Sequence, residues 1–240
     1  AALVELYQST GGADWLNRTG WLDFVAPAAP CTWFGVTCSG GRVTELVLPG
    51  NHLSGTLPAS LDAFTGLTRL RLENNALTGR IPKSICALAP TLTETNLAYN
   101  ALYARTRSAA QCADALAPDW RATQTTKVTD LRPVEFYTNA LRLAWTSISY
   151  TADGGYYEFL GALDASGPYS VVAQTADKTV SSHLVAGLAP GRSYFFAVRT
   201  VTPAHGDQPS TLTSDPALTV GATLAANGGR VLVAAYFPAD

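Results

Sequence analysis

Three copies of one short pattern follow each other between Val43 and Leu102. The first reads VTELVLPGNHLSGTLPASLDAFTG, the second begins at Leu67 with LTRLRLENNALTGR, and the third begins at Leu92 with LTETNLAYNAL. One asparagine position recurs in the copies, 24 and then 25 residues apart: Asn51, Asn75 and Asn100. A unit of this size cannot bury its own apolar face, so the copies must stack into a coil whose two ends are covered.

Within each copy, leucines alternate with other residues along a short strand. Leu46 and Leu48 in the first copy, like Leu70 and Leu72 in the second, are predicted to point into the coil. The recurring asparagines are expected to hydrogen-bond to the backbone of neighbouring turns. The residues between the leucines then face the concave side of the coil: Glu45, Val47, Pro49, Arg69, Arg71, Glu73, Glu94, Asn96 and Tyr99.

The charged residues of this concave face have two predicted roles. Arg69 lies between Glu45 and Glu94 in the repeat frame, which most simply predicts a ladder of ion pairs across the strands. Arg71, with its polar and aromatic neighbours, is the stronger candidate for ligand contact, because arginine and tyrosine are enriched at binding hot spots. We therefore predict a binding site formed by a set of concave-face residues: Arg69, Arg71, Glu73, Glu94, Asn96 and Tyr99.

Both ends of the coil are flanked by sequence able to cover them. In front, the spacing of Leu3, Leu6 and Tyr7 predicts a helix, and a Gly-Gly pair ends it. Behind, SAAQCADALAPDW predicts a short helix followed by Trp120, which can cover the last turn. Bulky aromatic side chains are expected to cover the first turn: Trp15, Trp21, Trp33 and Phe34.

The four cysteines all lie in the first half of the chain: Cys31, Cys38, Cys86 and Cys112. A local bridge between the first two would leave the other two to pair with each other, one of three possible pairings. A metal site would need C-x-x-C pairs or partnering histidines, and the spacings here differ. Disulfides are favoured, with metal binding and free thiols as the alternatives. Two disulfides imply an oxidising, extracellular compartment.

Several stretches of the first half resemble a known family. ALVELYQSTGGADWLNRTGWL, CTWFGVTC and GRVTELVLPGNHLSGTLPASL are similar to plant-type leucine-rich repeat proteins with a cysteine-paired N-terminal cap, and bacterial secreted and surface proteins contain similar segments. The resemblance covers about residues 1–122 and implies a cap over 1–41, then repeats and a C-terminal cap over 42–122. Because the repeats are few, the long horseshoe of a plant receptor is absent.

The second half has the pattern of an antiparallel sandwich. A polar stretch over 123–130 predicts a linker, and short alternating strands separated by turn-rich segments follow it. Trp145 on the second strand, and Leu188 and Tyr194 within GLAPGRSYFFAV, resemble a fibronectin type III domain over about 129–224, which we place at 131–224. The resemblance implies that the Tyr194 hydroxyl bonds back to the preceding backbone corner.

The tail at 225–240 is not needed for such a sandwich. Its NGG turn and the apolar run after it predict a hairpin onto the last strand, the start of a further domain, or a strand donated to another subunit. In the last case the assembly strand contains Val231, Leu232, Val233, Tyr236 and Phe237.

Several function classes are disfavoured by the sequence. A net charge of −2 without basic blocks argues against nucleic-acid binding, and no apolar run reaches the roughly 18–20 residues that span a bilayer. No catalytic motif appears, and structural roles are favoured for His52, His183 and His205. In TADGGYYE, Asp153 is one carboxylate where calcium takes 6–8 oxygens, so a plain turn is favoured there. We expect neither a cofactor nor a metal.

These patterns together predict a mainly β, multidomain, non-catalytic chain: a short leucine-rich repeat solenoid with helical caps followed by a fibronectin type III sandwich. The predicted function is an extracellular binding or adhesion module for a protein or glycan ligand at the cell surface. The alternative is a structural subunit whose copies join head to tail into an extracellular fibre through the tail. An accessory part of a larger secreted enzyme is a third possibility.

Overall fold

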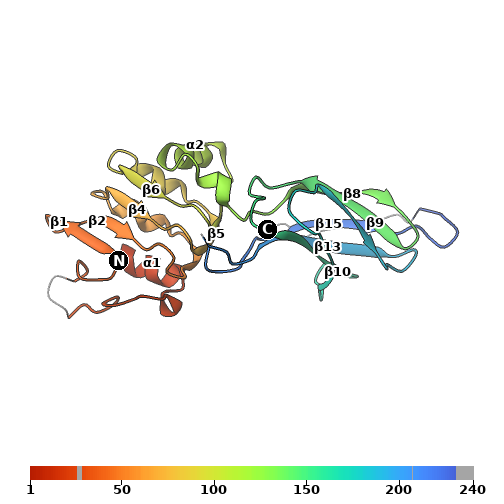
Figure 1. Cartoon of the computed structure of the whole chain (residues 1–240), viewed down its shortest axis with the longest axis horizontal. Helices are drawn as coiled ribbons and strands as arrows, with labels where there is room; N and C mark the ends of the chain where they lie inside the picture. Colours follow the sequence, from red (N-terminus) through yellow and green to blue (C-terminus); the bar gives the residue numbers. More distant parts are fainter. Residues whose placement is uncertain (26–28, 207, 231–240) are drawn as a thin grey trace. The chain divides into compact units, whose positions relative to one another are not determined.

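A computed structural model of the chain describes residues 1–25, 29–206 and 208–230 (Figure 1). It divides into two compact units. The first comprises Ala1–Thr125 together with Pro203–Leu212, and the second comprises Thr126–Thr202 and the chain from Thr213 onward. The predicted assembly strand, with Val231, Leu232, Val233, Tyr236 and Phe237, lies outside the described residues.

Parallel strands from successive copies of the repeat build the first unit. Its larger sheet has the order β1-β2-β4-β6, in which β2, β4 and β6 are parallel and β1 pairs antiparallel with β2. A second parallel sheet has the order β3-β5-β7. The strand bounds are Val36–Ser39 (β1), Arg42–Val47 (β2), Ser54–Thr56 (β3), Arg69–Arg71 (β4), Ala76–Arg80 (β5), Glu94–Asn96 (β6) and Ala101–Tyr103 (β7).

The recurring asparagines join one copy to the next, as predicted. Asn75 is fully buried, and its Oδ1 accepts hydrogen bonds from the backbone N–H of Asn51 at 2.9 Å and of Leu53 at 3.0 Å. Its Nδ2 donates to the carbonyl oxygen of Leu48 at 2.8 Å. Asn100 repeats this arrangement one copy later, donating to Leu72 O at 3.0 Å. Each side chain thus provides hydrogen-bond partners for backbone groups at the turn, where pairing between the strands ends.

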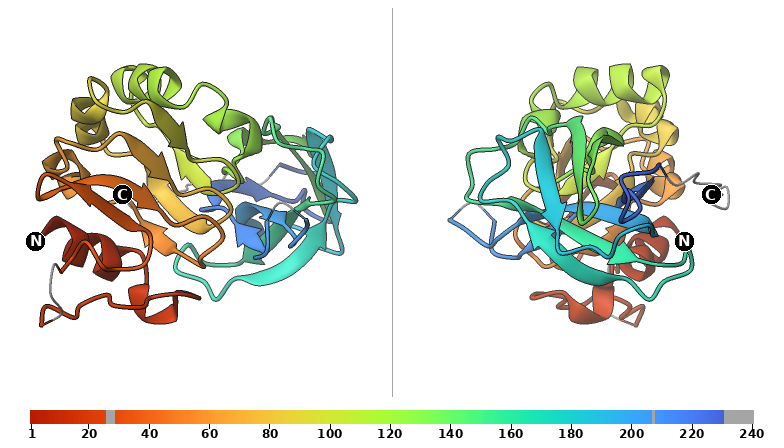
Figure 2. Two further views of the ribbon diagram at one scale, coloured as in Figure 1. Left: turned by 60° about the vertical axis from the view of Figure 1, so that its left-hand side comes forward. Right: turned by 90° about the vertical axis from the view of Figure 1, so that its right-hand side faces the viewer.

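Helical segments flank these strands and share their core. They are α1 (Ala2–Ser9), η1 (Gly12–Asp14), η2 (Ala59–Ala63), η3 (Lys83–Leu88), α2 (Arg107–Leu116) and η4 (Trp120–Thr123). Figure 2 shows α1 in red and α2 in green on opposite sides of the strands. Leu6 of α1 and Trp120 at the start of η4 belong to the same apolar cluster as the repeat leucines. Trp15, Trp21 and Trp33 are also buried in it, whereas Phe34 is 38% exposed, so its predicted covering role was wrong.

Both expected disulfides form in the first unit. Cys31 pairs with Cys38 of β1, and Cys86 of η3 pairs with Cys112 of α2. All four cysteines lie in the described residues, and none of them is free. The second bridge ties the helix that follows the repeats to the second copy of the repeat.

The second unit contains two antiparallel sheets. One has the order β12-β9-β8, and the other has the order β11-β10-β13-β14, with β15 also paired to β13. The strand bounds are Thr129–Phe136 (β8), Ala140–Thr146 (β9), Tyr156–Ala162 (β10), Ser170–Gln174 (β11), Ser182–Ala186 (β12), Ser193–Thr202 (β13), Leu212–Thr213 (β14) and Ala217–Ala222 (β15).

An aromatic core fills this second unit. Trp145 of β9 is buried, and its ring centroid lies 5.1 Å from that of Tyr157 and 5.5 Å from that of Phe159. The Tyr194 hydroxyl accepts a hydrogen bond from the backbone N–H of Ala189 at 2.8 Å, which confirms the predicted bond to the preceding corner. The apolar residues that alternate along these strands therefore point from both sheets into one core.

Candidate binding site at the end of the parallel sheet

The strand register of the larger sheet brings the predicted site residues together. Glu45, Arg69 and Glu94 occupy matching positions on β2, β4 and β6. Arg71 of β4 lies beside Asn96 of β6 in the same way. Neighbouring strands lie about 4.8 Å apart, so side chains at matching positions on one face are within contact distance.

The predicted ion-pair ladder forms across the three strands. Arg69 Nε lies 2.7 Å from Glu94 Oε2, and Arg69 Nη1 lies 3.3 Å from Glu45 Oε2. All three side chains are substantially exposed, and such surface pairs stabilise a protein by only about 0–1 kcal/mol. Arg69 therefore organises the face of the sheet and does not line the hollow described below.

Arg71 is held in place by a buried carboxylate. Its Nε donates to Glu73 Oε1 at 2.8 Å and lies 3.8 Å from Glu94 Oε1. The hydrogen bond and negative charge of Glu73 raise the pKa of the Arg71 guanidinium. Glu73, predicted as a contact residue, is only 4% exposed and is absent from the hollow, so the structure places it behind Arg71 as a support.

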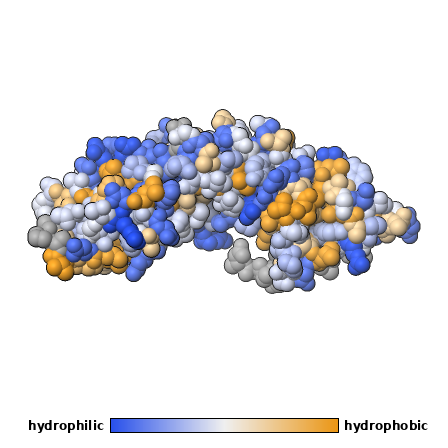
Figure 3. Space-filling view, turned by 60° about the horizontal axis from the view of Figure 1, so that its bottom comes forward, coloured by the Kyte–Doolittle hydropathy of each residue, from blue (hydrophilic) through white to orange (hydrophobic). Residues whose placement is uncertain are grey.

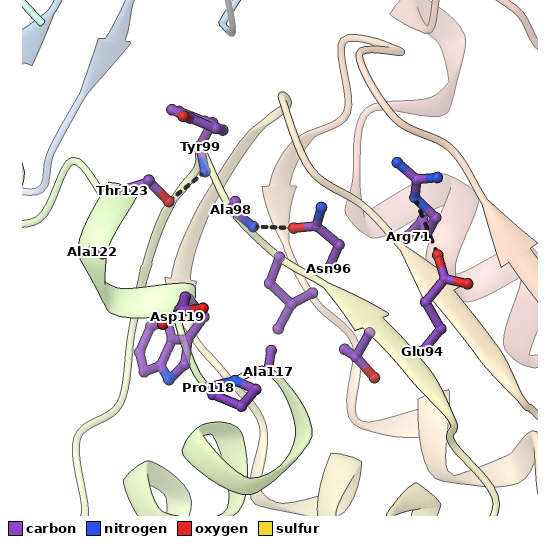
Figure 4. A pocket seen from close by; sticks show the side chains of 13 residues that line it. Arg71, Glu94, Asn96, Ala98, Tyr99, Ala117, Pro118, Asp119, Ala122 and Thr123 are labelled. Carbon is purple, nitrogen blue, oxygen red and sulfur yellow. Dashed lines mark hydrogen bonds and ion pairs between the residues drawn. The ribbon is translucent and has the colours of Figure 1, made fainter.

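A hollow of about 560 Å³ lies at the β6 end of this sheet (Figure 4). Four predicted residues contribute to one side of it: Arg71, Glu94, Asn96 and Tyr99. Thr95, Leu97 and Ala98 complete that side. Its volume falls within the roughly 300–1,000 Å³ typical of ligand pockets.

The opposite wall comes from the segment after α2, which the sequence patterns indicated only as a cover for the last turn. It is lined by Ala117, Pro118, Asp119, Trp120, Ala122 and Thr123. Trp120 anchors the wall, because its ring is buried and its Nε1 donates to Asp114 Oδ1 at 2.9 Å. Arg121 also pairs with Asp114 at 2.8 Å, and its guanidinium and the Trp120 indole lower the pKa of that carboxyl.

Tyr99 connects the two sides of the hollow. Its backbone has a positive φ of 53°, and its N–H donates to the Thr123 hydroxyl at 3.0 Å. Figure 4 shows Tyr99 and Thr123 at the same end of the hollow, with Asp119 further along the wall. The turn after β6 and the wall segment are therefore joined directly.

Gln208, which the sequence did not single out, bonds to the backbone next to the hollow but does not line it. It belongs to the 203–212 segment of the first unit and is fully buried. Its Nε2 donates to the carbonyl oxygens of Asn75 at 2.8 Å and Tyr99 at 2.7 Å, one repeat apart. The nearby ring of His205 lies 6.0 Å from that of Tyr99. No local pattern could have revealed Gln208, because it is 133 and 109 residues away from its partners.

Hollows elsewhere on the described part of the chain include two that contain none of the predicted site residues. These two, of about 420 and 320 Å³, are lined by residues along β8 and around η2 respectively. Figure 3 shows apolar patches on the surface of both units. Among the described residues, the large apolar side chains that are more than half exposed are Leu16, Phe24, Val25, Leu163 and Val171.

Among residues 1–25, 29–206 and 208–230, no three His, Cys, Asp or Glu side chains are grouped so that they could hold a metal ion. Within those same ranges, no helix is both long enough and apolar enough to cross a membrane.

Comparison with known proteins identifies a repeat family and a group of relatives. A family described as Leucine Rich Repeat matches residues 66–88. Over 85 residues the chain is 45% identical to the probable inactive receptor kinase RLK902 of Arabidopsis thaliana, covering 34% of this chain and 12% of the relative. Over 55 residues it is 54% identical to the receptor protein kinase WSS1 of Oryza sativa subsp. japonica, covering 22% of this chain and 6% of the relative. The chain thus spans a small part of the length of both relatives.

Among solved structures, a segment of two fibronectin type III domains from chicken tenascin is similar. The TM-score is 0.34 with 18% identity, and the match covers 42% of this chain and 51% of that one. The chain therefore contains a leucine-rich repeat and is related in sequence to plant receptor kinases.

Proposed function

We propose that this chain is a non-catalytic, extracellular binding module whose ligand is a protein. In this proposal, residues 1–41 cap a short leucine-rich repeat solenoid over 42–122, and a linker over 123–130 leads to a fibronectin type III domain over 131–224. Residues 123–125 of the linker bond to the last repeat, and segment 203–212 belongs to the first unit. The solenoid presents the ligand site, and the sandwich acts as a spacer. The two disulfides support an oxidising location, because such bonds persist mainly outside the reducing cytosol.

One observation is the main support for the binding role. The hollow beside β6 contains Arg71, Asn96 and Tyr99, which were nominated from the repeat frame alone. Arginine and tyrosine are among the residues most enriched at the energetic centres of protein interfaces, which favours a protein ligand over a glycan.

The test fills the hollow and asks whether binding is lost. Ala122 is exposed in the wall, so Ala122→Trp should occupy the hollow without disturbing the core. Ala89→Trp, at an exposed position after η3 and outside the lining, is the matched control. Short linear peptides displayed on phage are selected against the immobilised wild-type chain, and the affinities of the selected peptides are then measured against all three proteins.

The expected result is enrichment of peptides whose affinity falls about tenfold or more in Ala122→Trp and stays unchanged in Ala89→Trp. Failure to enrich any peptide, or equal binding to all three proteins, would contradict a ligand site in this hollow. Binding of glycans but not peptides, with the same sensitivity to Ala122→Trp, would contradict the protein ligand.

A further inference from the structure

The outer edge of β6 has backbone hydrogen-bonding groups that the sheet does not use. Glu94 donates its N–H to Thr68 O at 3.2 Å, and Asn96 accepts from Leu72 N–H at 2.9 Å, so both residues direct their backbone groups toward β4. In a parallel ladder, the residue between two such residues directs its N–H and C=O to the opposite side. Thr95 therefore presents both groups at the open edge, along the hollow that it lines.

The backbone that follows β6, unlike that of Thr95, has hydrogen-bond partners on its outer side. Segment 123–125 bonds to the outer backbone groups of residues 97–102 at 2.8–3.0 Å. The bonds are Gln124 Nε2 to Leu97 O, Tyr99 N to Thr123 Oγ1, Thr125 N to Asn100 O, and Leu102 N to Gln124 Oε1. These bonds seal the end of the coil from Leu97 onward. The bond nearest to Thr95 is the one to Leu97 O, and Thr95 itself lines the hollow.

The same sheet is already extended at its other edge. There β1 (Val36–Ser39) pairs antiparallel with β2 and covers it with an added strand. The sheet order β1-β2-β4-β6 thus ends in a supplied strand on one side and in β6 on the other. An unpaired strand edge is a template for another strand, since its N–H and C=O groups are spaced to receive one.

The side chain of Thr95 is more suitable for an open edge of β6 than for an edge covered by the core. Leu46 and Leu70 occupy this position in the first two copies and are fully buried. Thr95 replaces them in the third copy and is only partly buried. A leucine here would extend the apolar core into the hollow, whereas threonine leaves a polar floor beside the free backbone groups.

We propose that an extended segment of a partner protein binds in this hollow by adding a strand to the open edge of β6. The inference rests on the proposed function and specifies how the ligand is recognised. Backbone bonds to Thr95 provide affinity, and side-chain contacts provide selectivity, as in other cases of strand addition.

The lining indicates what such a segment contains. β6 has three residues, and a strand rises about 3.3 Å per residue, so the paired part is about three or four residues long. Ala117 and Pro118 favour a small apolar side chain facing the wall. Asp119 is exposed at the rim and lies outside the Arg69–Glu94–Arg71 ion-pair network, so it favours a basic residue next to the apolar one.

The experiment removes the backbone N–H of Thr95. Proline is tolerated in an edge strand where its missing N–H faces away from the sheet, so Thr95→Pro is compatible with the fold. Thr95→Val keeps the N–H and replaces only the hydroxyl with a methyl group, which makes it the matched control. Thermal unfolding establishes that both variants are folded, and the peptides selected on the full wild-type chain serve as the probe.

Thr95→Pro is expected to weaken peptide binding about tenfold or more, while Thr95→Val stays within about threefold of wild type. N-methylation of the peptide, one amide at a time, should weaken its affinity strongly at every second position and weakly at the positions between, because only every second N–H of an added strand faces β6. Binding should also slow hydrogen exchange at the Thr95 amide, a readout that remains available if Thr95→Pro does not fold.

The outcomes separate this inference from the proposed function. Peptides that are sensitive to Ala122→Trp but bind equally to Thr95→Pro and Thr95→Val would overturn strand addition and leave the binding site in place. Unchanged exchange at Thr95 on peptide binding would do the same. Absence of any selected peptide that depends on the hollow would overturn both.

Discussion

Lys178 shows how a single charge is accommodated in the second unit. Its side chain is fully buried, pairs with the Asp153 carboxylate, and donates to Thr202 Oγ1 at 3.0 Å. Its ammonium also lies 4.5 Å from the Tyr150 ring centroid, within cation–π distance. Burial lowers the pKa of Lys178, while the hydrogen bond and charge of Asp153 act in the opposite direction. Asp153, considered as a calcium ligand from sequence, instead neutralises this lysine.

A histidine in the same unit predicts a pH dependence. Partial burial, together with the charge of Arg142, lowers the pKa of His183, which stacks on Phe159 at 5.1 Å. As pH falls through the ordinary value of about 6.5, the unfolded chain takes up the proton before the folded one. This contribution to stability is therefore complete above that pH and is lost as pH falls toward the lowered, folded-state pKa.

We expect the protection of the β9 and β12 amides, relative to their intrinsic exchange rates, to decrease as pH falls from about 7.5 to about 5. The His183→Gln variant should not show this decrease. His52→Asn, in the first unit, controls for the loss of an imidazole. Identical pH behaviour of wild type and His183→Gln would contradict the assignment.

At the level of elements, the repeat period was enough to predict how the strands of the first unit stack. Leucines at matching positions place β2, β4 and β6 in register, and the buried asparagines join the copies at the predicted turns. Thr95 could be seen as a departure from the leucine pattern. Its consequence could not be predicted, because the open edge depends on where the non-repetitive segment after α2 packs.

The Cys86–Cys112 bridge holds that segment through α2, which gives a prediction at this level. The bridged residues are 26 apart, against 7 for Cys31–Cys38. Because a longer closed loop loses more entropy on cross-linking, replacing Cys86 and Cys112 by serine should lower the free energy of unfolding of the first unit by about 3 kcal/mol. Chemical denaturation followed by tryptophan fluorescence measures the change.

Serine at Cys31 and Cys38 is the matched control and should cost less. Peptide affinity for the hollow should also fall in the Cys86/Cys112 variant under conditions where it remains folded, since η4 forms the wall. A larger loss from the Cys31/Cys38 variant would contradict the loop-length argument.

For the whole molecule, the sequence predicted the kind of elements in each half better than the contacts that complete the site. The repeat period predicted the stacked strands of the first half, and the alternation of apolar residues predicted the antiparallel sheets of the second half. Both patterns are local in sequence. The hollow was only half predicted, because its wall comes from segment 117–123, which has no repeat register. Segment 203–212 was missed as part of the first unit, since a contact between Tyr99 and Gln208 spans 109 residues without any periodic signal.

The last prediction tests that segment. Gln208→Glu replaces a buried donor with a carboxylate facing the carbonyl oxygens of Asn75 and Tyr99. Burying an acceptor against acceptors should destabilise the first unit by at least about 2 kcal/mol, and hydrogen exchange in β5 and β7 should quicken accordingly. Gln8→Glu, at an exposed position of α1, makes the same chemical change and should leave exchange unchanged. A chain ending at Thr125 lacks Gln208 altogether and should exchange faster than the full chain at the same amides. Equal protection of β5 and β7 in all these proteins would show that Gln208 contributes nothing to the first unit.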